Sequence, residues 1–86
     1  MTPIRVLMVE DSEDDAALIA REIRRGGYEL AFTRVESEET MRGALNQKEW
    51  DLVVCVYSMP HFSGSDALRL LRSTGAECPF IFVSGT

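Results

Sequence analysis

The apolar and polar positions of the chain follow two spacings in turn. Four short runs rich in apolar and β-branched residues each predict a β-strand: residues 4–9 (IRVLMV), 29–35 (ELAFTRV), 51–57 (DLVVCVY) and 79–84 (PFIFVS). The third run is the most continuously apolar, which is typical of a strand covered on both faces. The second run is more polar, so we expect it at an edge of the sheet.

Three segments between these runs carry apolar residues at the three- and four-residue spacing of one helical face. The stripes are Ala16, Ile19, Ala20 and Ile23 in the first segment, Met41, Ala44 and Leu45 in the second, and Ala67, Leu68, Leu70 and Leu71 in the third. Ser12 and Ser37 are placed to cap the first two helices. Gly26-Gly27 and Gly75 are placed to end the first and the third, because glycine accepts a positive φ.

Strands that alternate with helices predict an α/β fold with a parallel sheet, because each β-α-β connection is a right-handed crossover. In doubly wound sheets, functional groups gather beyond the carboxyl ends of the strands. Here Glu10 and Asp11 follow the first strand, residues 56–58 end the third, and residues 84–86 end the fourth. We therefore expect any site to lie along this one rim.

The composition limits the size of the protein and its partners. The 86 residues allow one small domain, which we assign to residues 1–86. A net charge of −5 argues against a nucleic-acid binder. No apolar segment is long enough for a signal peptide or a membrane span, so we expect a cytoplasmic protein. Cys55 and Cys78 lack metal-ligand spacing, and Cys55 is expected in the core.

The acidic residues near the first helix also have a simple explanation. Carboxylates are favoured at helix N-termini by the helix dipole, and this explanation suffices for Asp14 and Asp15. His61 has no recognisable nucleophile or base as a partner, which disfavours a catalytic role. From the residues alone, Glu10 and Asp11 therefore indicate either surface acids or a metal site.

The stretches RVLMVEDSEDDA, WDLVVCVYSMPHFSG and PFIFVSGT, in that order and at this spacing, resemble the receiver domain of two-component response regulators. The resemblance covers the whole chain. It implies a flavodoxin-like, three-layer fold with strand order 2-1-3-4 that lacks the final helix-strand-helix of the family. It also implies a phosphorelay in which a histidine kinase supplies a phosphoryl group to an aspartate at the end of the third strand.

The resemblance assigns roles to individual positions. Glu10 and Asp11 match the acidic pair that holds Mg²⁺, and the backbone carbonyl of Ser58 matches a further metal ligand. Ser84 matches the switch residue that hydrogen-bonds the phosphoryl group. Val56 falls on the phosphoacceptor aspartate itself. Phosphoryl transfer needs an oxygen nucleophile, which valine does not offer.

We therefore predict a receiver-type module, not an enzyme, that does not accept phosphate and acts through protein–protein interaction. The family's lysine has no counterpart, because Lys48 is the only lysine and precedes the third strand. With two carboxylates and one carbonyl, Mg²⁺ is expected to bind weakly. Two alternatives remain open: an active phosphoacceptor that uses another nucleophile such as Ser58, and an unrelated α/β phosphohydrolase.

The last expectation concerns the exposed edge of the fourth strand. In the family this strand is interior, whereas here the chain stops directly after it, so residues 79–84 would form an exposed apolar edge. We therefore expect self-association through this strand, most simply as a two-fold dimer.

Overall fold

The computed structural model describes residues 3–47, 49–56 and 62–83. Within these ranges the chain forms β1 (Ile4–Val9), α1 (Glu13–Arg25), β2 (Leu30–Val35), α2 (Glu38–Gln47), β3 (Leu52–Val56), α3 (Gly64–Ser73) and β4 (Phe80–Val83). Every strand and helix expected from the spacing is present. The strands begin one residue later than predicted in three cases, yet the residues before them still take part in the sheet: the Ile4 N–H donates to the Glu29 carbonyl and the Val53 N–H to the Pro79 carbonyl.

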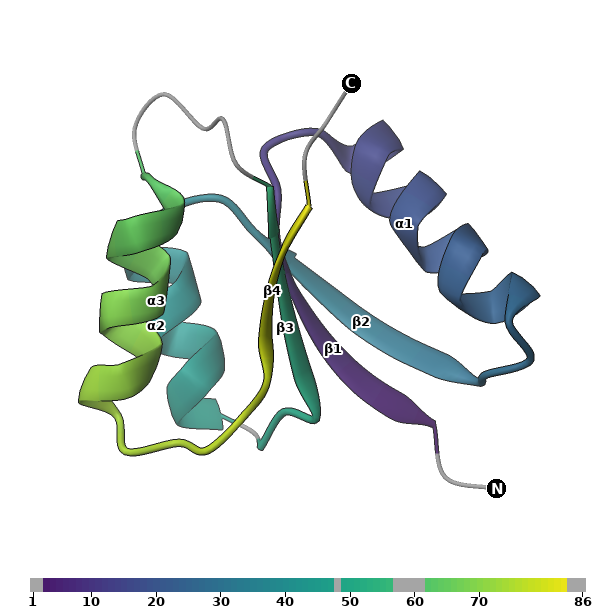
Figure 1. Ribbon diagram of the computed structural model, residues 1–86. Coiled ribbons are helices and arrows are strands. Elements are labelled where there is room, and N and C mark those ends of the chain that lie inside the picture. Colours follow the sequence, from purple (N-terminus) through teal and green to yellow (C-terminus); the bar gives the residue numbers. More distant parts are fainter. Residues whose placement is uncertain (1–2, 48, 57–61, 84–86) are drawn as a thin grey trace.

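The four described strands form one sheet in the order β2-β1-β3-β4, and all neighbouring pairs are parallel. Val9 is in register with both Val35 and Cys55, and Val56 is in register with Val83. Figure 1 shows α1 on one face of the sheet and α2 with α3 on the other. The flavodoxin-like arrangement and the strand order are thus as predicted, and β2 lies at an edge.

The core is divided between the two faces because successive side chains of a strand point to opposite sides. Leu7 and Val9 of β1 pack with the residues of α2 and α3, whereas Val6 and Met8 pack with Ala16 and Ala20 of α1. The central strands β1 and β3 are therefore covered on both faces, as their continuous apolar runs predict.

The helix ends follow the cap residues. Ser12 Oγ accepts a hydrogen bond from the Asp15 N–H at 3.2 Å, and Ser37 Oγ accepts one from the Thr40 N–H at 3.1 Å. Gly27 follows α1 with φ of +94°, which only glycine adopts readily, whereas Gly26 before it has φ of −74°. No helix in the described parts of the chain is long and apolar enough to cross a membrane.

Candidate functional site

Glu10 directly follows β1 and is held at the carboxyl edge of the sheet by its backbone. Its N–H donates to the Val35 carbonyl at 2.9 Å, and its carbonyl accepts from Nη1 of Arg34 at 3.1 Å. The side chain turns inward, and the residue is only 2% exposed. Oε1 accepts the Ser12 N–H at 3.0 Å, whereas Oε2 is buried and has no hydrogen-bond partner among the described residues.

The electrostatics of this carboxyl group follow from its burial. Burial raises the pKa of Glu10, and the neighbouring carboxyl groups of Asp11 and Asp15 raise it further. The hydrogen bond from Ser12 opposes this effect by favouring the ionised form. Asp11, by contrast, is exposed. The two acids that the sequence presents as a pair therefore differ in surroundings, since one is buried and the other is solvated.

Val56 is the last residue of β3. Because Val9 pairs with Cys55, the next residues along these two strands, Glu10 and Val56, follow at the same edge of the sheet. The Val56 side chain is 8% exposed and belongs to the apolar cluster between the sheet and α2 with α3. It places methyl groups, and no oxygen, at the end of the central strand.

Cys55 lies beside Val56 and could in principle supply a nucleophile at this edge. Its thiol is fully buried, and burial together with the negative charge of Glu10 raises its pKa to about 11. The thiolate is the reactive form of cysteine, so Cys55 is inert at neutral pH. It is a core residue, as the sequence predicts.

Arg34 is a residue of this edge that the sequence analysis missed. Besides the contact with Glu10, its guanidinium forms ion pairs of 3.5 Å with Glu13 of α1 and with Glu36 after β2. Its side chain is only 24% exposed. The sequence does show a basic residue near the end of a predicted edge strand. It does not show which acidic residues it contacts, because these lie on other segments of the chain.

The other expected site residues, Ser58 and Ser84, lie outside the described residues, as do Tyr57 and His61. Within the described residues, no group of three or more His, Cys, Asp or Glu side chains is arranged to hold a metal ion. The fit to Mg²⁺ is therefore partial: Glu10 Oε2 is a buried oxygen without a donor, and Asp11 is an exposed carboxylate next to it in sequence.

A parallel sheet in the order 2-1-3-4 with helices on both faces is the arrangement of the flavodoxin-like doubly wound class. Residues 6–86 match the family described as "Response regulator receiver domain". The chain therefore belongs to this family, and the predicted family and fold class are confirmed.

The relatives are bacterial response regulators. The transcriptional regulatory protein PrrA of Mycobacterium tuberculosis is 32% identical over 84 residues, which are 98% of this chain and 35% of PrrA. The cell cycle transcriptional regulator CtrA of Caulobacter vibrioides is 29% identical over 83 residues, 96% of this chain and 35% of CtrA. The chain thus spans about a third of the length of these curated relatives.

Solved structures agree on the fold. A response regulator from Hahella chejuensis superposes with a TM-score of 0.80 at 27% identity, over 96% of this chain and 64% of the other. The MaeR response regulator bound to beryllium trifluoride superposes with a TM-score of 0.81 at 19% identity, over 96% of this chain and 68% of the other.

Proposed function

We propose that this chain is a receiver module of a two-component system that does not accept a phosphoryl group at position 56. The observation that carries the proposal is Val56, an apolar side chain packed into the core at the end of β3. Phosphoryl transfer to a receiver needs an oxygen nucleophile in line with the phosphorus, together with cations that neutralise the developing charge. Val56 supplies no oxygen, and the neighbouring Cys55 thiol is protonated and buried.

Phosphorylation by a small donor tests this proposal. The protein is incubated with acetyl phosphate and Mg²⁺, and its intact mass is measured. We expect no adduct on the protein as it stands. Fluorine NMR with beryllium fluoride and Mg²⁺ provides a second readout, for which we expect no bound signal. A stoichiometric adduct would overturn the proposal, and peptide mapping would then identify the alternative nucleophile, such as Ser58 or a neighbouring acid.

The matched variant is Val56→Asp, which places a carboxylate at the end of β3. We expect this variant to gain Mg²⁺ binding more readily than phosphorylation, because the chain offers no lysine beyond β3 to contact a phosphoryl group. Equal gains in metal binding and phosphorylation would show that the acceptor carboxylate alone was missing.

We also propose that Mg²⁺ binds weakly at Glu10 and Asp11. Glu10 offers one buried oxygen that no described residue hydrogen-bonds, and Asp11 is exposed. Mg²⁺ prefers six oxygen ligands in a strict octahedron and gives up water reluctantly, so these groups hold it poorly. Calorimetric titration should show half-saturation only at millimolar concentrations or above. Tight binding that Asp11→Asn abolishes and Asp14→Asn leaves intact would contradict this.

The partners follow from the family. We propose that the chain contacts a histidine kinase or another phosphorelay protein in the cytoplasm and has no catalytic activity of its own. The relatives named as transcriptional regulators are matched over about a third of their length, and the net charge of −5 does not favour nucleic-acid contact by this domain. A mobility-shift assay with duplex DNA should show no complex at physiological salt.

Self-association of this chain through β4 is the last part of the proposal. The strand reads Phe-Ile-Phe-Val without a charge, and Ile81 is 48% exposed. Among the described strands, β4 pairs with β3 alone, so it lies at an edge of the sheet. Uncharged apolar edge strands pair readily with a second copy. Sedimentation equilibrium should show a dimer that Ile81→Lys disrupts and Tyr28→Lys, a change at another exposed apolar residue, does not. A monomer at all concentrations would rule this out.

A further inference from the structure

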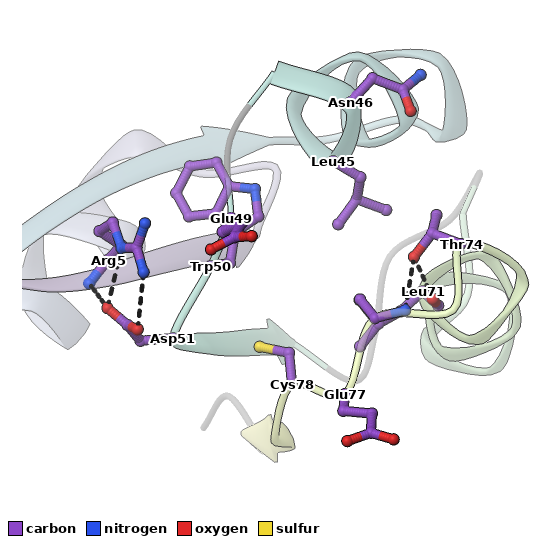
Figure 2. A pocket seen from close by; sticks show the side chains of 11 residues that line it. Arg5, Leu45, Asn46, Glu49, Trp50, Asp51, Leu71, Thr74, Glu77 and Cys78 are labelled. Atoms are coloured by element: carbon purple, nitrogen blue, oxygen red, sulfur yellow. Dashed lines mark hydrogen bonds and ion pairs between the residues drawn. The ribbon is translucent and has the colours of Figure 1, made fainter.

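A pocket of about 510 Å³ opens at the amino ends of β1, β3 and β4, at the opposite edge of the sheet from Glu10 and Val56. Described residues from three separate parts of the chain line it: Arg5 at the start of β1, the end of α2 with residues 49–51, and the end of α3 with the segment before β4 (Figure 2). Its size is in the range of pockets that hold small organic molecules. The receiver chemistry does not use it.

One part of the pocket wall is apolar. Leu45 of α2, Leu71 of α3 and the indole of Trp50 line it (Figure 2). The Trp50 Nε1–H donates to the Ala44 carbonyl at 3.1 Å, which fixes the orientation of the ring. The Cys78 thiol completes this wall, and burial raises its pKa, with the charge of Asp51 adding to the effect. The Cys78 thiol is therefore mostly protonated at neutral pH and offers a neutral contact surface.

The other part of the wall is charged, and among its described residues carboxylates outnumber guanidinium groups. Arg5 lines the pocket, but its N–H donates to Asp51 Oδ2 at 2.8 Å, its Nε to the same atom at 3.2 Å and its Nη2 to Oδ1 at 3.2 Å. The positive charge of Arg5 is thus already matched by a carboxylate. Glu49 and Glu77 also line the pocket, and neither forms an ion pair with another described residue.

Among the described residues that line the pocket, one guanidinium and three carboxylates give a net charge of −2. These carboxylates would repel an anionic ligand, because the Arg5 guanidinium is already paired with Asp51. A cation with an apolar body suits both parts of the wall: its charge is attracted by Glu49 and Glu77, and its body packs on Leu45, Leu71 and the aromatic ring of Trp50.

We propose that this pocket binds small organic amines that carry an aryl or alkyl body. The proposal is independent of the receiver site, because the two places lie at opposite edges of the sheet. Its failure or success therefore leaves the proposed function unchanged.

Trp50 makes the test direct, since it is the only tryptophan of the chain and lies in the pocket wall. The probes are phenethylamine, phenethyl alcohol and phenylacetate, which share the phenyl group and differ in charge. At neutral pH we expect a saturable change in tryptophan fluorescence with the amine. The alcohol should bind about fivefold more weakly, since an exposed charge pair contributes up to ~1 kcal/mol, and phenylacetate should not bind.

The variants Glu77→Gln and Glu49→Gln remove one charge each at exposed positions, so the fold is expected to persist. Each should weaken amine binding about threefold to fivefold and leave binding of the alcohol unchanged. The matched control is Glu39→Gln, which removes an exposed carboxylate from α2 outside the pocket and should change nothing. Circular dichroism checks that all three variants are folded.

Alkylation of Cys78 is a second readout that does not depend on fluorescence. Cys55 is fully buried, so iodoacetamide should modify Cys78 first. Saturating phenethylamine should slow this modification, and phenylacetate should not. The proposal is overturned if the three probes bind equally, if none gives a saturable signal, or if both pocket variants bind the amine like the control.

Discussion

The two edges of the sheet place a carboxyl group in opposite situations. At the carboxyl edge, Glu10 is 2% exposed, and one of its oxygens has no hydrogen-bond partner in the part of the chain that the structure describes. At the amino edge, Asp51 is exposed and accepts three hydrogen bonds from Arg5. Burial raises the pKa of Glu10, whereas the Arg5 side chain lowers the pKa of Asp51.

The different surroundings of Asp51 and Glu10 have different effects on the free energy of unfolding. A solvated carboxylate needs no desolvation to stay ionised, so the Arg5–Asp51 pair links β1 to the start of β3 without a desolvation cost. A buried carboxylate without a full set of donors costs free energy at neutral pH. Glu10 is such a group at the carboxyl edge, and the apolar side chain of Val56 adds no second charge at the end of β3.

Val56→Asp should give the largest effect, because it adds a second carboxylate to the edge that already holds Glu10. In the absence of metal we expect the free energy of unfolding to fall by about 3 kcal/mol, from the burial of a charge and its repulsion by Glu10. Urea denaturation measures this change. In Val56→Asn the new side chain has the shape of aspartate without its charge, so the free energy of unfolding should fall by a smaller amount.

Mg²⁺ should reduce the difference in the free energy of unfolding between Val56→Asp and Val56→Asn, because the bound cation offsets the added negative charge. A melting temperature of Val56→Asp without Mg²⁺ that equals or exceeds that of the parent protein would show that the carboxyl edge tolerates two carboxylates at no cost.

Glu10→Gln should stabilise the protein at neutral pH by about 1 kcal/mol. The amide oxygen can still accept the Ser12 N–H, and the buried charge is gone. The pKa of Glu10 is raised above its ordinary value of 4.5, so its favourable contribution is present below that pH and is lost as pH rises through the folded-state pKa. The gain of the variant should therefore shrink as the pH is lowered toward 4.5. A gain that does not depend on pH would refute this account.

Asp51→Asn should have the smallest effect, a drop of a few degrees at most in melting temperature at neutral pH, because the pair is exposed and screened. The pKa of Asp51 is lowered from 3.8, so its contribution is present above that value and is lost as pH falls through the folded-state pKa. The variant should match the parent protein in strong acid. High salt should also reduce the difference, whereas Glu10→Gln should respond little to salt.

The spacing of apolar residues predicted every described strand and helix, because each must bury one face or one stripe. The identities of individual residues also predicted the cap at Ser12 and the glycine turns after α1 and α3, since these depend on local backbone geometry alone. The strand order came from the resemblance to receivers, as the same alternation of strands and helices is compatible with other orders.

The character of each site residue was decided by the tertiary structure. Glu10 and Asp11 are neighbours of similar chemistry, and nothing in the sequence tells which one is buried. The ladder with β2 and the turn into α1 direct Glu10 inward and leave Asp11 in solvent. The free energy needed to keep a carboxyl group ionised depends on its exposure to solvent and on nearby hydrogen-bond donors. Both are set by how segments distant in sequence pack around it.

By itself the sequence determined the α/β class, the likeness to the receiver family and the presence of valine at position 56, because these properties depend on local spacing and on residue identity. Only the tertiary structure decided that Arg34 contacts Glu10, that Arg5 reaches Asp51 across 46 positions, and that a pocket opens beside this pair. Such contacts form when the chain crosses over to bury its apolar faces, and no local pattern encodes them.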